Sequence, residues 1–227
     1  MGESLRKRTR QEIGWARELA DRLSSLPQPP DLSRERAQLE GLEHRLSALG
    51  PDSAGAKPSK NNEAVPDWIW YPEGQPAKDA PAEVRFFRCT FEAEDVTRVR
   101  VAELRIAADD ACEISLNGIQ VGVHGTWQTA AVFQVGRLLK SGKNVLAVRA
   151  ENRPAPAKNP AGLIVQLTFV LADGTRNVIV SDGSWRAHKA EQTGWRRPEF
   201  DDGGWPAAKV AAPFGGGPWR RIRGLAG

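Results

Sequence analysis

The sequence predicts a mainly β protein: an antiparallel β-sandwich over residues 67–227, preceded by an α-helical hairpin over residues 1–50 and a linker over residues 51–66. The period of the apolar residues supports this division, because it is three to four in the first part and two in the last. Frequent turn signals, from 22 glycines and 16 prolines in the whole chain, indicate many short strands. No predicted strand is followed by a long helical stretch, which excludes a βαβ sheet.

Two amphipathic helices are expected in residues 1–50, separated by a proline-rich break at residues 27–30. Isolated helices of this length are marginal in water, so their apolar stripes must be buried on the following domain, on a part of a longer parent protein, or on a second copy of the chain. Residues 51–66 contain three prolines and few apolar side chains, which is typical of a linker. The stripes are Ile13, Ala16, Leu19, Ala20, Leu23 and Leu26, and then Leu32, Leu39, Leu42, Leu46 and Leu49.

The last part of the chain alternates apolar and polar residues, as half-buried strands do. Asn117-Gly118 and Asp173-Gly174 are hairpin turn signals, and residues 152–161 form a long proline-rich connection. Eight or nine short strands joined in this way predict two packed antiparallel layers. The clearest strands are expected around residues 87–91, 102–108, 112–116, 119–123, 132–135, 144–151, 163–171 and 178–180.

Charge and hydropathy exclude two kinds of partner. The 32 basic and 28 acidic residues give a net charge of +4, divided as +1 over residues 1–50 and +3 over the remainder. Neither part therefore has the concentrated positive field that nucleic-acid binding requires. No run of 18 apolar residues is present, so we expect no membrane span. The basic segment at residues 6–10 is followed by an amphipathic stretch, so we expect no signal peptide in this chain.

No pattern of residues indicates an enzyme. The acidic doublets Asp109-Asp110 and Asp201-Asp202 are the most concentrated carboxylates, but adjacent side chains on a strand leave opposite faces and make a poor acid–base pair. No glycine-rich loop opens a helix after a strand, which removes the usual nucleotide sites. Three histidines lie far apart and fit no zinc or triad spacing. They are His44, His124 and His188.

Two cysteines, Cys89 and Cys112, are too few for a disulfide framework or a four-cysteine metal site. Both lie in predicted strands and are expected to be small buried side chains. A single bridge between them remains an alternative, provided that neighbouring strands bring their Cα atoms within about 7 Å.

Eight tryptophans against one tyrosine favour a binding surface for sugars, because an indole can stack on the apolar face of a sugar ring. Trp127 and Trp195 have polar neighbours in loops and are the candidates for exposed, carbohydrate-binding indoles. We expect a sugar site near Trp127, Asp110, Asn152 and Arg153, where the long connection and the first hairpin can rim one end of the sandwich. The tryptophans expected in the core or as lids over it are Trp68, Trp70, Trp185 and Trp205.

Several motifs between residues 67 and 219 together carry a family resemblance. They are WIWYPE, RFFRCTF, AELRIAADDACEISLNGIQVG, LLKSGKNVLAVRAENRPAPAKNPAGLIVQL, DGT, SDGSWR and FDDGGWPAA. This series resembles the galactose-binding-like jelly-roll module found at the front of α-L-rhamnosidases and in many large secreted bacterial proteins. The strand end AADD, the hairpin LNG, the strand GKNVLAV and the turn DGSW are its most specific parts.

The resemblance implies a jelly-roll sandwich that binds a sugar, sometimes with a structural calcium, or that only supports a neighbouring domain. It implies no catalytic residue, since rhamnosidase chemistry belongs to a separate helical barrel. It also implies an extracellular or periplasmic location. No loop has an EF-hand pattern, and the residues leave open whether a metal binds.

We therefore predict a noncatalytic accessory module of a larger secreted protein, with a glycan as its ligand. The alternative is a structural or protein-interaction domain that docks against other domains, or against a second copy through the helical hairpin, without binding sugar. The sequence does not identify the sugar.

Overall fold

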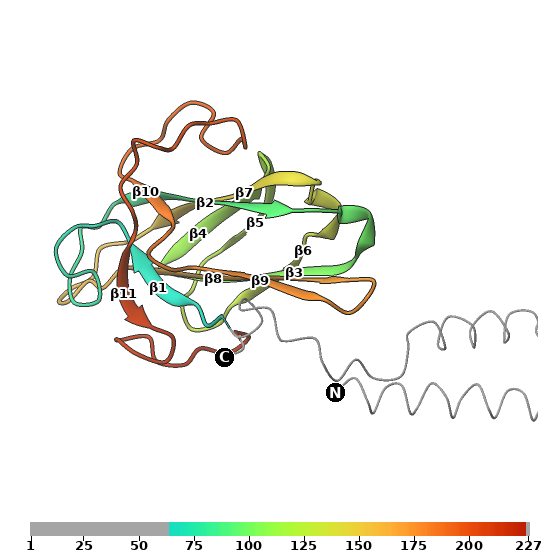
Figure 1. The fold of residues 1–227 in the computed structure, drawn as a ribbon. Helices are drawn as coiled ribbons and strands as arrows, with labels where there is room; N and C mark the ends of the chain where they lie inside the picture. Colours follow the sequence, from blue (N-terminus) through green and yellow to red (C-terminus); the bar gives the residue numbers. More distant parts are fainter. Residues whose placement is uncertain (1–63, 226–227) are drawn as a thin grey trace, which may run out of the picture. The chain divides into compact units, whose positions relative to one another are not determined.

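Two antiparallel β-sheets face one another in the computed structural model, which describes residues 64–225 (Figure 1). We call this sandwich the module. The predicted helical hairpin over residues 1–50, its docking role and most of the predicted linker lie outside the described residues. Within residues 64–225, no helix is long and apolar enough to cross a membrane.

The first sheet contains six strands in the order β11-β1-β8-β3-β6, with β9 paired to the second half of β8. The second sheet contains five strands in the order β10-β2-β7-β4-β5. The strands of the first sheet are β1 (Asp67–Trp70), β3 (Val99–Asp109), β6 (Ala131–Gln134), β8 (Gly162–Leu171), β9 (Arg176–Val180) and β11 (Lys209–Pro213). Those of the second are β2 (Val84–Ala93), β4 (Ala111–Leu116), β5 (Ile119–His124), β7 (Gly142–Glu151) and β10 (Arg186–His188). Two 3-10 turns, η1 (Val96–Arg98) and η2 (Gly136–Leu138), complete the regular structure of the described residues.

The predicted β-sandwich is confirmed, and the expected strands are present. Three short strands, β1, β10 and β11, were not predicted as strands, because segments of four, three and five residues are too short for alternation to be recognised. They form because longer neighbours offer them pairing partners: β1 pairs with β8 and β11, and β10 pairs with β2. The Asn117-Gly118 hairpin also forms as expected, with β4 and β5 antiparallel.

The core lies between the sheets and is built from the inward-facing half of each alternating strand. Leu104 and Ile106 of β3 and Leu146 and Val148 of β7 are completely buried. Trp70 adds its indole to this core against Phe87, with ring centroids 5.4 Å apart. Burial of apolar area at about 25 cal/mol per Å² is the main stabilising contribution of such a layer.

The outer face of the first sheet is covered by the chain that follows β11. The indole of Trp219 stacks on that of Trp68 at a centroid distance of 4.5 Å and an interplanar angle of 23°. Ile222 and Leu225 join this second apolar cluster. Gly162 lies directly under the two indoles, where a side chain would have no room.

The outer face of the second sheet is covered by residues 189–205, which Arg88 of β2 holds in place. The Arg88 guanidinium is 1% exposed and pairs with Asp202 at 2.7 Å. It also donates to the backbone carbonyls of Trp195, Arg197 and Phe200. A buried charge of this kind is stable because it is paired with a carboxylate and four of its five N–H groups find acceptors.

Both cysteines are free, so the alternative of a disulfide is wrong for this fold. Cys89 lies on β2 and Cys112 on β4, and β7 runs between these strands. Two strand spacings of about 4.8 Å each exceed the reach of a disulfide. Burial raises the pKa of both thiols to about 12.

Replacing Gly162 with alanine should destabilise the module by about 1–3 kcal/mol, because the added methyl group overpacks the stacked indoles. Its Cβ would lie 2.7 Å from Cζ2 of Trp219 and 2.8 Å from Cε3 of Trp68. The matched control is Gly204→Ala, where no atom lies within 4 Å of the new Cβ. Urea unfolding of the two variants measures the difference, and an equal effect of both would contradict this packing.

Candidate functional site

Antiparallel pairing brings five strand ends together at one end of the sandwich. Glu151, the last residue of β7, lies opposite both Val84 at the start of β2 and Ala111 at the start of β4. Asp109 at the end of β3 lies opposite Gly162 at the start of β8. We call this the Asp110 end, and it carries the long loop after β1 that lies to the left in Figure 1.

Asp110 and Arg153 are brought into direct contact there, as the sequence predicted for a common site. Oδ2 of Asp110 accepts a hydrogen bond from the backbone N–H of Arg153 at 2.7 Å. The Asp110 N–H donates to the carbonyl of Glu151 at 2.8 Å. The backbone of residues 151–153 therefore holds both the main chain and the carboxylate of Asp110. The Arg153 side chain is exposed, and its Nε lies 3.5 Å from Glu151.

Asn152 lies at the same end, but its side chain is buried, with 2% exposure. Its Nδ2 donates to the carbonyls of Ala80, at 3.2 Å, and Pro81, at 2.9 Å. Its Oδ1 is buried too and has no hydrogen-bond partner among the described residues. An unsatisfied buried acceptor costs about 1–3 kcal/mol, a cost that a donor or a cation bound to this oxygen would remove.

Asp109 is a site residue that the sequence reasoning missed. Its carboxyl is 6% exposed, and Oδ2 accepts a hydrogen bond from Nε1 of Trp219 at 2.8 Å. Burial raises its pKa to about 6; the bond from Trp219 opposes this shift, and the neighbouring Asp110 adds to it. The signal available in the sequence was an acidic doublet placed directly at a strand end.

Trp127 also belongs to the Asp110 end. His124 at the end of β5 lies opposite Cys112 near the start of β4, so the loop of residues 125–130 leaves the sheet at this end. The Trp127 side chain is half-buried and packs against the cluster that contains Trp219. Part of the indole therefore remains accessible, as a stacking surface requires.

The expectation of an exposed Trp195 is wrong. Its indole is 2% exposed and packs edge-on against Phe86, with centroids 5.2 Å apart, and beside Trp205. The guanidinium of Arg196 lies over the ring at 5.1 Å, and Nε1 donates to Glu191. This tryptophan is part of the cover on the second sheet, because the outer face of β2 presents an aromatic side chain that needs burial.

A hollow of about 670 Å³ lies away from the Asp110 end, between Gly118 and residues 191–197. Three of its polar side chains, Glu191, Gln192 and Arg196, already have partners in the surrounding structure. Arg196 pairs with Glu113 at 3.1 Å, and Gln192 accepts from Nε1 of Trp205 at 3.3 Å. These contacts favour a structural role for the hollow, in contrast to the unsatisfied oxygen of Asn152.

Among the described residues, no group of three or more histidine, cysteine, aspartate or glutamate side chains is placed to hold a metal ion. Side-chain oxygen atoms at the Asp110 end include the carboxylates of Asp109, Asp110 and Glu151 and the amide oxygen of Asn152. Such oxygen donors suit a hard cation rather than zinc.

Comparison with known proteins agrees with this architecture. No family model matches the sequence. An α-L-rhamnosidase of Streptomyces avermitilis is 42% identical over 166 residues, which are 70% of this chain and 16% of that enzyme. A crystal structure of Streptomyces avermitilis α-L-rhamnosidase complexed with L-rhamnose superposes with a TM-score of 0.65. The matched region is 71% of this chain and 16% of the rhamnosidase chain.

Two further solved structures show the same fold. A lectin from Pleurotus ostreatus in complex with GalNAc is 25% identical, with a TM-score of 0.64, over 74% of this chain and 48% of the lectin. A GH78 family rhamnosidase of Bacillus sp. GL1 is 26% identical, with a TM-score of 0.58, over 73% of this chain and 20% of that chain.

Fold and likeness together define the class: the described residues form an antiparallel β-sandwich similar to a segment of α-L-rhamnosidases and to a lectin. Within that class, the module is of the kind found in α-L-rhamnosidases, as the motifs of the sequence suggested. The chain spans only 16% of the curated relative that it matches.

The Asp109→Asn variant tests whether the Asp109 carboxyl is buried, through the pH dependence of the free energy of unfolding. Because the folded pKa of about 6 lies above the usual 3.8, the folded state binds more protons than the unfolded state between these values. The wild type should therefore lose stability, relative to the variant, as pH rises from about 4 to 6, with a slope of at most about 1.4 kcal/mol per pH unit.

Urea unfolding of both proteins in the presence of a chelator measures this difference. Asp173→Asn is a control of opposite sign, because a hydrogen bond from the backbone of Thr175 lowers the pKa of the exposed Asp173. A stability difference between wild type and Asp109→Asn that is independent of pH would show that the carboxyl is not held as described.

Proposed function

We propose that the module binds a carbohydrate, without catalysis, at the Asp110 end. The observation that carries this proposal is the buried and unsatisfied Oδ1 of Asn152, beside a carboxylate that the backbone of Arg153 holds in place. The names of the relatives support it, since one solved structure contains L-rhamnose and another contains GalNAc.

The residues at this end supply the contacts that a neutral sugar needs. The carboxylate oxygens of Asp110 accept hydrogen bonds from sugar hydroxyl groups, and the exposed Arg153 guanidinium donates them. The amide oxygen of Asn152 is buried and accepts a hydrogen bond only from a group that enters between the loops. The accessible part of the Trp127 indole can stack on the apolar face of the ring. Because the loops are already hydrogen-bonded to one another, little order must be created on binding.

Calcium is the cofactor that the resemblance implies, and the oxygen donors at the Asp110 end are of the chemical type that it prefers, but among the described residues no three acidic side chains are placed to hold an ion. The carboxylates of Asp109 and Asp110 and the amide oxygen of Asn152 are the chain's own groups that would hold the ion. When bound, calcium would supply positive charge that offsets two adjacent carboxylates and attracts sugar hydroxyl oxygens. Binding assays therefore need a calcium arm and a chelator arm.

A catalytic role is not supported by the arrangement of the carboxyl groups. A glycosidase places two of them on either side of the scissile bond, about 5–9.5 Å apart. Asp109 and Asp110 are adjacent in the chain, and Asp109 is engaged by Trp219. We therefore propose an accessory role within a larger secreted protein, and the resemblance supports an extracellular or periplasmic location.

Asp110→Ala should weaken the binding of L-rhamnose by tenfold or more, because the carboxylate contacts the ligand and also holds Arg153. Asp173→Ala is the matched control, since Asp173 lies in the turn between β8 and β9, on which no site residue depends, and should change the affinity less than twofold. Isothermal titration with L-rhamnose and with GalNAc, with and without calcium, measures both variants.

The rival is a structural or protein-interaction domain. Failure of the folded wild type to bind any sugar on a glycan array, with or without calcium, would contradict the proposed function. Concentration-dependent self-association in light scattering, together with such a failure, would favour the rival.

A further inference from the structure

We infer that Arg85 is a positioning residue for the proposed sugar site and acts through the loop of residues 71–83. This inference rests on the proposed function. Arg85 is 3% exposed and lies next to the start of β2, at the Asp110 end. Its guanidinium is turned to the loop and makes no hydrogen bond to Asn152 or Asp110.

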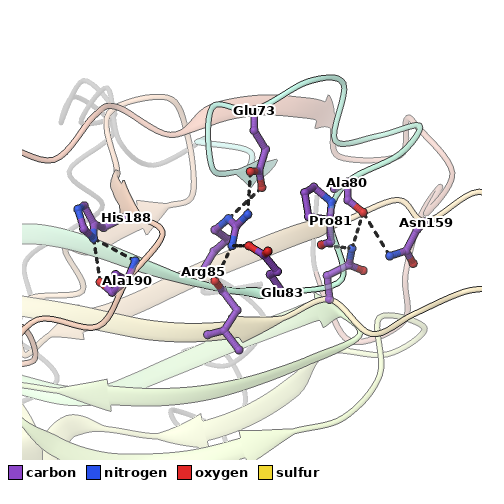
Figure 2. Close-up of polar contacts among 10 residues, drawn as sticks. Glu73, Ala80, Pro81, Glu83, Arg85, Asn159, His188 and Ala190 are labelled. Atoms are coloured by element: carbon purple, nitrogen blue, oxygen red, sulfur yellow. Dashed lines mark hydrogen bonds and ion pairs between the residues drawn. The ribbon is translucent and has the colours of Figure 1, made fainter.

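Arg85 closes the loop by binding near both of its ends (Figure 2). Nε and Nη2 donate to the two carboxylate oxygens of Glu73 at 2.9 and 2.7 Å, in a bidentate pair. Nη1 donates to Glu83 at 2.7 Å and to the carbonyl of Val84 at 2.9 Å. The ring of Tyr71 lies 5.4 Å from the guanidinium carbon. The pair with Glu73 is the stronger restraint, since Glu83 is largely exposed to solvent.

The segment that Arg85 closes provides every hydrogen-bond acceptor that Asn152 uses. Ala80 and Pro81 accept from its side-chain Nδ2, and Glu83 accepts from its backbone N–H at 3.0 Å. The two donors of the amide are thereby committed to two neighbouring carbonyl oxygens. Their positions decide where the free Oδ1 of Asn152 points.

The loop is also hydrogen-bonded to the long connection after β7. Ala80 N–H donates to the carbonyl of Asn159 at 2.8 Å. Figure 2 shows the second bond, in which Nδ2 of Asn159 donates back to the carbonyl of Ala80. Ala161 N–H donates to the carbonyl of Pro76 at 2.9 Å. Restraint of residues 71–83 by Arg85 therefore extends to residues 159–161, at the far end of this connection.

A purely structural role predicts something different from a positioning role. Buried ion pairs often contribute little net stability, because desolvation offsets the attraction between the charges. Loss of the bidentate pair between Arg85 and Glu73 should then leave the sheets intact but make the loop of residues 71–83 more mobile. Sugar binding would have to order this loop again, which lowers the affinity. The cost should appear in affinity, and only while Asn152 is present to be positioned.

The test uses Arg85→Lys in the full 227-residue chain, because lysine keeps the charge but cannot form the fork to Glu73. In the sugar-free protein, hydrogen exchange at the amides of Ala80, Asn152 and Ala161 should accelerate tenfold or more, with exchange in β7 unchanged. L-Rhamnose affinity in isothermal titration should fall at least fivefold. Arg98→Lys, at the exposed pair with Asp173, is the control and should change neither readout.

A double-variant cycle separates positioning from general stability. Added to Asn152→Ala, the lysine substitution should cause no further loss of affinity, because the group that it positions is gone. If Arg85→Lys fails to fold, Glu73→Gln takes its place in the cycle, because it removes the other charge of the same ion pair. A loss that adds to that of Asn152→Ala, or faster exchange throughout the sheets, would overturn the inference.

The two proposals fail in different ways. A wild type that binds sugar while Arg85→Lys binds equally well, with unchanged loop exchange, overturns the role of Arg85 and leaves the proposed function intact. A wild type that binds no sugar overturns the proposed function and, with it, the role of Arg85 in binding. In that case, amide hydrogen exchange in the Arg85→Lys variant still decides whether Arg85 keeps the loop of residues 71–83 hydrogen-bonded to Asn152.

Discussion

The structure depends on the pairing of β7 with both of its neighbours. Because Glu151 lies opposite Val84 and Ala111 at once, the starts of β2 and β4 must meet the end of β7 at one place. Hydrogen bonds between neighbouring backbones allow no slip of one residue here, since a slip would turn the buried face of β7 outward. Asp110, which precedes β4, and Asn152 and Arg153, which follow β7, become neighbours as a consequence.

Each sheet needs a cover on its outer face, and the last third of the chain provides both covers. Trp219 closes the first sheet over Trp68, and it also reaches Asp109 at the Asp110 end. Arg88 fastens the other cover by binding backbone carbonyls and Asp202. Most of the tryptophans are therefore occupied in packing, which leaves Trp127 as the accessible indole of the proposed site.

The sequence predicted the sandwich because alternation and turn chemistry are local signals. Asn117 and Gly118 adopt positive φ angles of 56° and 83°, the conformation that this hairpin turn requires. The sequence could not predict that Trp195 is covered or that Asn152 is buried, because both facts depend on segments distant in the chain. Asp110, Arg153 and Trp127 lie at one end, as expected from the long connection after residue 151, but the turn of the first hairpin, which was expected to rim the same end, lies at the opposite end of β4. Asp109 was missed because its partner, Trp219, is 110 residues away.

The central claim is that a sugar binds where the β7 register gathers these loops. A titration of the isotopically labelled chain with L-rhamnose in calcium, followed by amide resonances, tests it most directly. The account predicts that the largest shifts fall on Asp110, Asn152 and Arg153 and on the loop of residues 71–83. Shifts confined to residues 191–197, or none at saturating sugar, would contradict it.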